Sequence, residues 1–166
     1  MEGPHTKVLS LSFQRRIIMR VMVYLHIKSG RIMVPSISKT EAGFYLDCDP
    51  VEMAEVDNAL SISLAVRRTL DRGCTQVPTP GRDEFQKWVL LKNTNSKTPR
   101  ELHRQCLIWS FDEDSNKGFR IEGFKNLPNG KGAEPDPAVV TVLPPGTSFE
   151  HAIEKLLGMI KTHPED

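Results

Sequence analysis

Long apolar runs, paired cysteines and an excess of one charge are all missing from this sequence of 166 residues. No stretch approaches the roughly 18 apolar residues that a membrane-spanning helix needs. Cys48, Cys74 and Cys106 form no C-x-x-C pair, and their odd number argues against a disulfide framework. We therefore expect buried, free thiols in a reducing cytoplasm. Twenty-two basic residues oppose 21 acidic ones, and this net charge of +1 argues against binding of nucleic acid by bulk electrostatics. We expect no membrane partner either, although a basic membrane-surface or transit segment at the N-terminus is the alternative.

Motifs that carry catalysis or bind cofactors are missing as well. The sequence has no G-x-S-x-G nucleophile elbow, no G-x-x-x-x-G-K-[ST] phosphate loop and no G-x-G-x-x-G dinucleotide loop. His26, His103 and His151 are isolated from one another, and no group of His, Cys and carboxylate residues has the spacing of a metal site. We expect no cofactor, no metal and no enzymatic activity.

The alternative is a small hydrolase or nuclease whose active-site residues are dispersed along the chain. One pair of suitable chemistry is His151 with Glu154, and another is His26 with Lys28. Purified protein that hydrolyses RNA or DNA, and loses that activity on His151→Ala, would favour this alternative.

Composition predicts one globular domain, because 39% of residues are hydrophobic and 26% are charged. Charge is spread unevenly, with +5 over residues 1–32, zero over 33–106 and −4 over 107–166. Residues 1–21 are basic and only weakly periodic, so we expect a poorly ordered extension there. The domain is then expected over residues 22–166.

One order of elements occurs twice in this domain. The first copy, residues 22–73, has β-rich runs at 22–27, 32–37, 43–46 and 51–56. A helix follows, and Gly73 is its predicted end. The apolar side of this helix carries Ile62, Ala65, Val66, Thr69 and Leu70.

The second copy, residues 107–161, has strands at 107–111, 118–121 and 139–143 and then a helix. Five of the six apolar positions of this helix coincide with those of the first helix when shifted by 87 residues: Phe149, Ala152, Ile153, Leu156, Leu157 and Ile160. Gly43-Phe44 and Gly118-Phe119 are matched as equivalent, residues 127–137 are assigned to a loop, and Thr147 with Glu150 forms a predicted capping box.

A helical connector is expected between the copies, over residues 80–106. Its first helix, residues 83–91, carries Trp88 as a core anchor, and its second begins at Thr98-Pro99 with Glu101 completing a capping box. The fold class is therefore α+β, with an internally duplicated strand-strand-strand-helix unit joined by a helical connector.

This order of elements resembles the immunity proteins of bacterial contact-dependent growth inhibition. The matching stretches are residues 38–70, the connector with Trp88 over 85–106, and residues 108–160 with Gly118-Phe119, so the resemblance covers about residues 23–161. It implies a cytoplasmic protein that binds and neutralises the C-terminal toxin domain, commonly a nuclease, delivered by a neighbouring cell. An interaction protein with an unknown partner is the other binding function that the sequence leaves open.

A nuclease active site is basic because it binds phosphate groups, so the resemblance implies an acidic contact surface on this chain. Asp112–Asp114 are expected at a solvated hairpin tip in the acidic C-terminal part. Asp47 and Asp49 are expected on the corresponding loop of the first copy. The complete set of expected toxin-binding residues is Asp112, Glu113, Asp114, Glu134, Asp136, Asp47 and Asp49.

Overall fold

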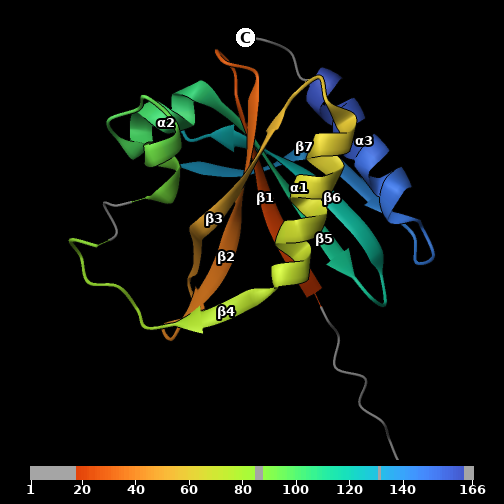
Figure 1. Cartoon of the computed structure of the whole chain (residues 1–166), viewed down its shortest axis with the longest axis horizontal. Helices are drawn as coiled ribbons and strands as arrows, with labels where there is room; N and C mark the ends of the chain where they lie inside the picture. Colours follow the sequence, from red (N-terminus) through yellow and green to blue (C-terminus); the bar gives the residue numbers. More distant parts are fainter. Residues whose placement is uncertain (1–17, 85–87, 131, 163–166) are drawn as a thin grey trace, which may run out of the picture.

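A seven-stranded sheet forms the centre of the computed structural model, which describes residues 18–84, 88–130 and 132–162. Two long helices cover one face of the sheet, and a short helical segment covers part of the other (Figure 1). The elements in chain order are β1 (Ile18–His26), β2 (Arg31–Thr40), β3 (Tyr45–Glu55), α1 (Ala59–Arg72), β4 (Cys74–Val77), the 3-10 helix η1 (Val89–Asn93), α2 (Pro99–Gln105), β5 (Cys106–Asp114), β6 (Gly118–Asn126), β7 (Ala133–Leu143) and α3 (Phe149–Thr162).

The strand order β3-β2-β1-β5-β6-β7 gives two equivalent halves. Each half is an antiparallel meander of three strands that is followed by a helix. The halves meet where β1 and β5 pair antiparallel over nine residues, from Ile18 opposite Asp114 to His26 opposite Cys106. The predicted α+β class is confirmed, and both halves have the predicted order of strands and helix.

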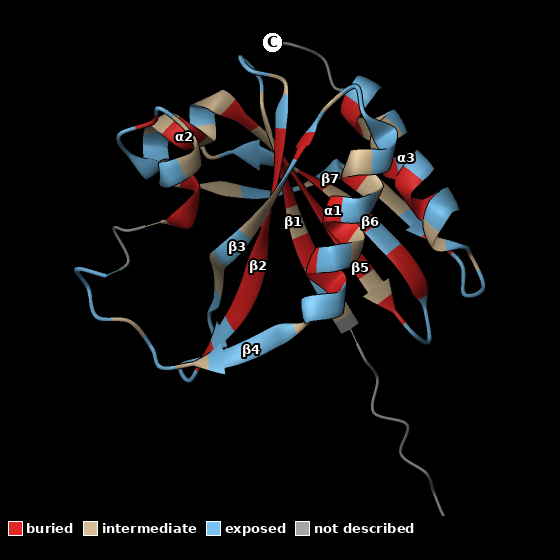
Figure 2. Ribbon diagram, in the orientation of Figure 1, coloured by how far each residue is buried: buried red, intermediate tan, exposed pale blue. Residues whose placement is uncertain are grey.

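Alternation along the strands separates two cores, one on each face of the sheet. Val21 and Val23 of β1 point to the face that α1 and α3 cover, and there they join the larger core with Trp109 of β5. Tyr24 belongs to the smaller core, with Cys106 and the buried residues of η1 and α2. Figure 2 shows buried residues along the central strands and on the inner sides of both long helices.

The long helices bury the apolar positions that their 3.6-residue periodicity selects. Val66 of α1 and Ile153 of α3 both lie in the larger core, as the duplication predicts. The predicted ends of two helices are also confirmed, since Gly73 ends α1 with φ +68° and the Thr98 hydroxyl accepts from the Glu101 N–H at 3.2 Å. At α3 the expected cap is wrong: the Ser148 hydroxyl accepts from the His151 N–H at 3.2 Å, whereas the Thr147 hydroxyl donates to the Pro144 carbonyl at 2.7 Å.

The expected boundary of the domain at residue 22 is wrong. Strand β1 starts at Ile18, because β5 provides a pairing partner for every residue from there on. Val21 is 1% exposed in the larger core, and Met19 packs against that core. Residues 18–21 are thus part of the domain, and the remainder of the expected extension, residues 1–17, lies outside the described residues.

The match of Gly43-Phe44 with Gly118-Phe119 is also wrong. Gly43 precedes the third strand of the first half, whereas Gly118 begins the second strand of the second half. The runs at 43–46 and 51–56 are parts of one strand, β3. Strand β7 starts at Ala133, inside the expected loop over 127–137, and an edge position tolerates its Pro135 and Pro137.

Two further local differences concern the segment after α1. Residues 74–77 form a short strand, β4, that was not expected and pairs parallel with β2. The helix expected over 83–91 is replaced in its last part by η1, while residues 85–87 lie outside the described residues.

Candidate binding cleft

The sheet divides between β1 and β2, which creates a cleft. The two strands pair only where Tyr24, Leu25 and His26 face Met33, Ile32 and Arg31. Beyond this point, Ile37–Thr40 of β2 pair with β4, and β3 occupies the opposite side of β2. Strand β4 therefore lies on the same side of β2 as β1. Within the described ranges, residues 18–23 of β1 pair with β5 alone, so one edge of β1 faces the cleft.

Two cavities occupy this division. One, of about 810 Å³, extends from Met19 of β1 to Cys74 and Gln76 of β4, with the C-terminal end of α1 behind it. The other, of about 580 Å³, lies on the side of the connector and is lined by Tyr24, Asp47, Trp88 and His103 among others. Arg20 and Tyr45 line both cavities, so the cavities lie next to each other, and we refer to the two together as the cleft.

An aromatic side chain stands exposed at the rim of the cleft. Tyr45, at the start of β3, lines both cavities and is 60% exposed, and Phe44, which precedes it in the chain, is 59% exposed. Lys39 lies over the Tyr45 ring, with its Nζ 5.7 Å from the ring centroid. Exposed aromatic side chains of this kind contribute strongly to protein interfaces.

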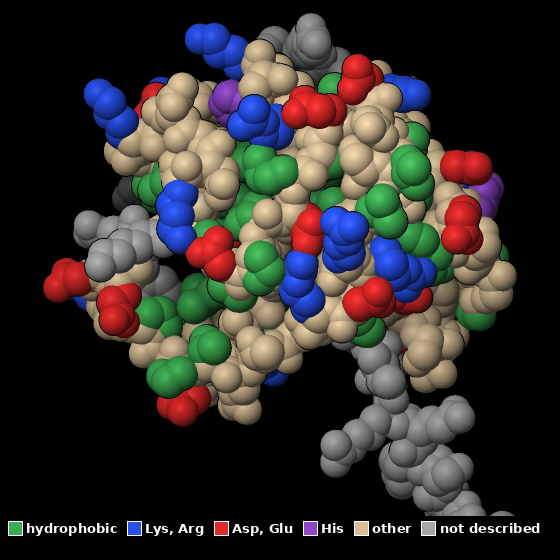
Figure 3. All heavy atoms as spheres, in the orientation of Figure 1, with side chains coloured by type: hydrophobic (Ala, Val, Ile, Leu, Met, Phe, Trp, Pro, Cys, Tyr) green, Lys and Arg blue, Asp and Glu red, His purple; other side chains and the backbone are tan. Residues whose placement is uncertain are grey.

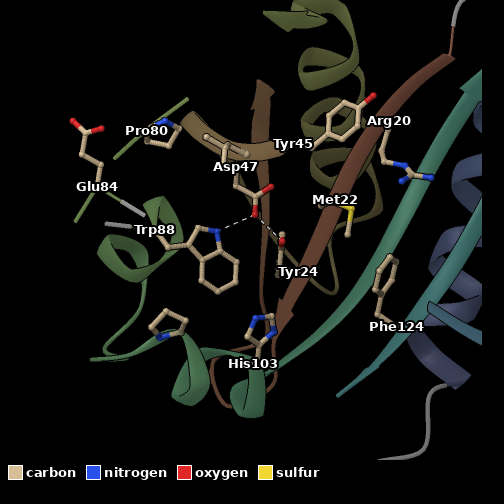
Figure 4. Close-up of a pocket in the computed structure, with 12 residues that line it drawn as sticks. Arg20, Met22, Tyr24, Tyr45, Asp47, Pro80, Glu84, Trp88, His103 and Phe124 are labelled. Carbon is tan, nitrogen blue, oxygen red and sulfur yellow. Dashed lines mark hydrogen bonds between the residues drawn. The ribbon is translucent and has the colours of Figure 1, made fainter. Parts of the chain in front are cut away.

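Asp47 forms the polar centre of the smaller cavity (Figure 4). Its Oδ2 accepts two hydrogen bonds, from the Tyr24 hydroxyl at 2.7 Å and from the Trp88 Nε1–H at 3.0 Å. Burial raises the pKa of Asp47, and the two hydrogen bonds partly oppose this rise because they stabilise the carboxylate. Burial and the Asp47 charge together raise the pKa of Tyr24, so Tyr24 remains a neutral donor.

His103 forms the wall of the cavity beside Trp88. The two rings are 5.2 Å apart between centroids and 31° from parallel. The Nδ1 atom of His103 is buried and has no hydrogen-bond partner among the residues that the structure describes. Burial lowers the pKa of His103, so its ring is held in the neutral form.

Asp112–Asp114 were expected at a solvated hairpin tip, but two of these three residues are buried within a strand. Asp112 and Asp114 lie inside β5 and are 7% and 9% exposed, and their side chains lie on the same face of the sheet as that of Arg20. Asp112 forms a two-point ion pair with Arg20, and Asp114 accepts from the Asn116 backbone N–H at 2.9 Å. Glu113 is half-buried on the other face, with its Oε2 3.7 Å from Arg67.

The other expected toxin-binding residues are dispersed over the molecule. Asp47 and Asp49 lie within β3 rather than on a loop, and Asp49 pairs with Lys92 at 2.6 Å. Glu134 pairs with Lys125 at 3.6 Å on β7, at the opposite edge of the sheet, where Asp136 accepts from the Ala138 backbone N–H. The structure thus gathers no acidic patch from this set. On the face shown in Figure 3, acidic and basic side chains are interspersed.

The cysteines and histidines are equally dispersed. All three thiols are free, but only Cys106 is buried, whereas Cys48 is half-buried and Cys74 exposed. Hydrogen bonds join His26 to Ser29 and Gln105, and His151 lies 3.4 Å from Glu154 on the surface of α3. Within residues 18–84, 88–130 and 132–162, no group of three or more His, Cys, Asp or Glu residues could hold a metal ion. No helix in these ranges combines the length and the apolar character that crossing a membrane requires.

The fold is similar to those of solved structures. The chain superposes on "Protein of Unknown Function NMB0488 from Neisseria meningitidis" with a TM-score of 0.65 and 14% identity, over 92% of this chain and 100% of that chain. It is also similar to a chain of the "CdiA-CT/CdiI toxin and immunity complex from Yersinia pseudotuberculosis", with a TM-score of 0.54 and 12% identity, over 88% of this chain and 98% of that chain. No family model and no curated sequence matches.

Proposed function

We propose that this chain is an immunity protein that binds a toxin domain of another protein and thereby neutralises it. The observation that carries the proposal is the similarity, over 88% of the chain, to a protein in a toxin and immunity complex. The resemblance found in the sequence supports the same function independently of the coordinates. The protein would act in the cytoplasm of a bacterium and would protect it from a toxin, in our interpretation a nuclease, delivered by neighbouring cells.

The cleft between β1 and β4 is the surface that we assign to the toxin. A strand edge such as residues 18–23 of β1 offers backbone N–H and C=O groups to an extended segment of a partner. The cavities beside this edge provide space for the side chains of that segment. Tyr45 at the rim adds exposed aromatic area that a partner would cover.

The acidic residues expected from the sequence have a smaller role in this proposal. Asp112 and Asp114 are buried, and Glu113, Asp49 and Glu134 each have a basic neighbour within the chain. A partner would have to replace these internal ion pairs in order to use the carboxylates. Contact through the cleft requires no such exchange.

The test is binding of the purified chain to the toxin domain encoded immediately upstream of its gene. Tyr45→Ala should weaken the complex by about tenfold or more, as expected for an aromatic residue at the centre of an interface. Val142→Ala is the matched control, because Val142 is 62% exposed on β7, at the far edge of the sheet. It should change the dissociation constant by less than about twofold.

Isothermal titration measures both constants, and survival of cells that express the toxin domain measures protection. Absence of a complex, with no protection of those cells, would overturn the proposed function. A complex that Val142→Ala weakens and Tyr45→Ala does not would move the interface away from the cleft. Hydrolysis of RNA or DNA by the chain alone would favour an enzyme instead.

A further inference from the structure

The carboxylate of Asp47 has unused capacity to bind a ligand. Both of its hydrogen bonds, from Tyr24 and from Trp88, reach the same oxygen, Oδ2. Among the described residues, none donates to Oδ1. A carboxylate accepts hydrogen bonds at both oxygens, so Oδ1 can accept from a ligand. Asp47 is half-buried and lines the cavity, so a ligand there can reach its carboxylate.

The walls around Asp47 suit the hydrocarbon stem and the charge of a cationic side chain. Tyr24 and Trp88 meet edge to face, with centroids 5.8 Å apart, and the His103 ring lies beside Trp88, with centroids 5.2 Å apart. Figure 4 shows the indole and the Tyr24 hydroxyl converging on the carboxylate, with Phe124 and Met22 across the cavity. Aromatic rings next to a carboxylate attract a cation through both the ring faces and the charge.

The charges that face this cavity leave it attractive to a cation. Arg20 is the basic residue in its lining, and Arg20 is engaged by Asp112 through two bonds of 2.7 Å. His103 is held neutral by burial. Glu84 adds a second carboxylate at the rim, where its Oε2 accepts from the Gly81 backbone N–H at 2.9 Å. Tyr24 and Tyr45 complete the titratable groups of the lining.

We propose that the cavity formed by Tyr24, Asp47, Trp88 and His103 binds a lysine or arginine side chain of the partner, with the cationic group on Asp47 Oδ1. That the side chain belongs to a toxin rests on the proposed function. That the cavity selects a cation with an apolar stem rests on this chain alone. The two statements are therefore tested separately.

Selection of a cation is tested with the full chain and three small probes. N-acetyl-argininamide and N-acetyl-lysinamide carry a charge, whereas N-acetyl-norleucinamide has a neutral stem of similar size. The Trp88 indole N–H signal in a ¹⁵N NMR spectrum reports binding, and the Trp88→Phe variant distinguishes it from the signal of Trp109. A charged probe should bind at least about tenfold more tightly than norleucinamide, with dissociation constants on the order of millimolar. Equal shifts from all three probes would overturn the inference.

Asp47→Asn removes the charge and keeps an oxygen that can accept from Tyr24 and Trp88. It should weaken binding of the charged probes by about tenfold and leave norleucinamide unchanged. Glu154→Gln is the control, since Glu154 is 73% exposed on α3, which covers the other face of the sheet, and it should change binding of either kind by less than about threefold. A charged probe that binds the Asp47→Asn protein as tightly as the unmodified protein would contradict the role of Asp47.

The unmodified protein gives a second measurement, which applies even if Asp47→Asn fails to fold. A bound cation stabilises the carboxylate, so a saturating charged probe should lower the pKa that the ¹³C signal of the Asp47 carboxyl reports. Norleucinamide should not lower it. An unchanged Asp47 pKa at saturation with a charged probe would overturn the inference.

Binding to the toxin domain then separates this inference from the proposed function. If the toxin binds the Asp47→Asn protein as tightly as the unmodified protein, the cavity does not receive a side chain of that toxin and the proposed function stands. If the charged probes bind and no toxin does, the cavity selects cations and the proposed function fails.

Discussion

Arg20 of β1 and Asp112 of β5 face each other across the centre of the sheet and form a two-point ion pair. Nε–Oδ1 and Nη2–Oδ2 are both 2.7 Å apart. The hydrogen bond to Asp112 is the largest cause of the raised pKa of Arg20, so Arg20 keeps its charge. Asp112 is 7% exposed, and Arg20 is its ion-pair partner. The pair joins the two halves of the fold.

Replacing Asp112 by Ala should therefore destabilise the protein, because Arg20 loses its partner and a buried site loses its charge-assisted bonds. We expect a loss of about 1–2 kcal/mol, at the lower end for such bonds because Arg20 is half exposed to solvent. Urea unfolding measures the loss. Glu113→Ala, which removes a longer contact with Arg67, should cost less than about 1 kcal/mol. If Asp112→Ala and Glu113→Ala lowered the free energy of unfolding equally, the Arg20–Asp112 ion pair would contribute no more to stability than the longer contact of Glu113.

The duplicated helices provide a second prediction. Val66→Ala in α1 and Ile153→Ala in α3 should each lower the free energy of unfolding by about 1–4 kcal/mol, because both side chains are buried in the larger core. Leu60→Ala is the control, since Leu60 is 70% exposed on α1, and it should cost no more than about 0.5 kcal/mol. If Ile153→Ala had no effect while Val66→Ala did, the two helices would not have equivalent roles.

The periodicity of these helices made them predictable, and so did the local caps at Gly73 and Thr98. Local patterns gave no information about which strands pair. The span from Ile18 to Val21 is a strand because β5, about 90 residues later, pairs with it. Strand β4 consists of four exposed or half-buried residues that show no alternation of apolar and polar side chains. No sequence pattern therefore predicted that strand.

The candidate site was less predictable for the same reason. Tyr24, Asp47 and Trp88 are separated by 23 and 41 positions along the chain and meet only because β3 and the connector fold against β1. Asp112 and Asp114 had the composition of a solvated tip, and their strand continued into it because Arg20 and the Asn116 backbone provided polar partners. Trp88 was expected as a core anchor, and it does pack against the smaller core; that it is only half-buried and also lines a cavity could not be predicted from the sequence.

The three thiols should differ in their reactivity with an alkylating reagent. Cys74 is exposed and should react first in the folded protein, although burial and neighbouring charge raise its pKa. Burial raises the pKa of Cys106 to about 12, so Cys106 should react only after unfolding. Mass spectrometry of peptides after brief labelling distinguishes the sites. Labelling of Cys106 as fast as Cys74 in the folded protein would contradict its burial in the smaller core.

His103 should make the stability depend on pH. Its pKa is lowered in the folded protein by burial, so below the ordinary value of about 6.5 the unfolded chain binds a proton that the folded chain resists. The contribution of His103 to stability should therefore fall as the pH decreases from about 6.5 through the lowered pKa. Unfolding of the unmodified protein and of His103→Gln at several pH values isolates this contribution, and the difference between them should shrink with acid. An NMR titration that places the His103 pKa at or above its ordinary value would contradict the prediction.

The central claim, that a toxin domain binds in the cleft between β1 and β4, is tested most directly by amide hydrogen exchange with and without the toxin domain encoded upstream. Exchange is measured residue by residue in NMR spectra of the labelled chain. Amides of β1 residues 18–23 that face the cleft, and those of β4 on the same side, should become protected in the complex. The amides along the outer edge of β7 should exchange at an unchanged rate. A stable complex that protects β7 and leaves both β1 and β4 unprotected would contradict the claim.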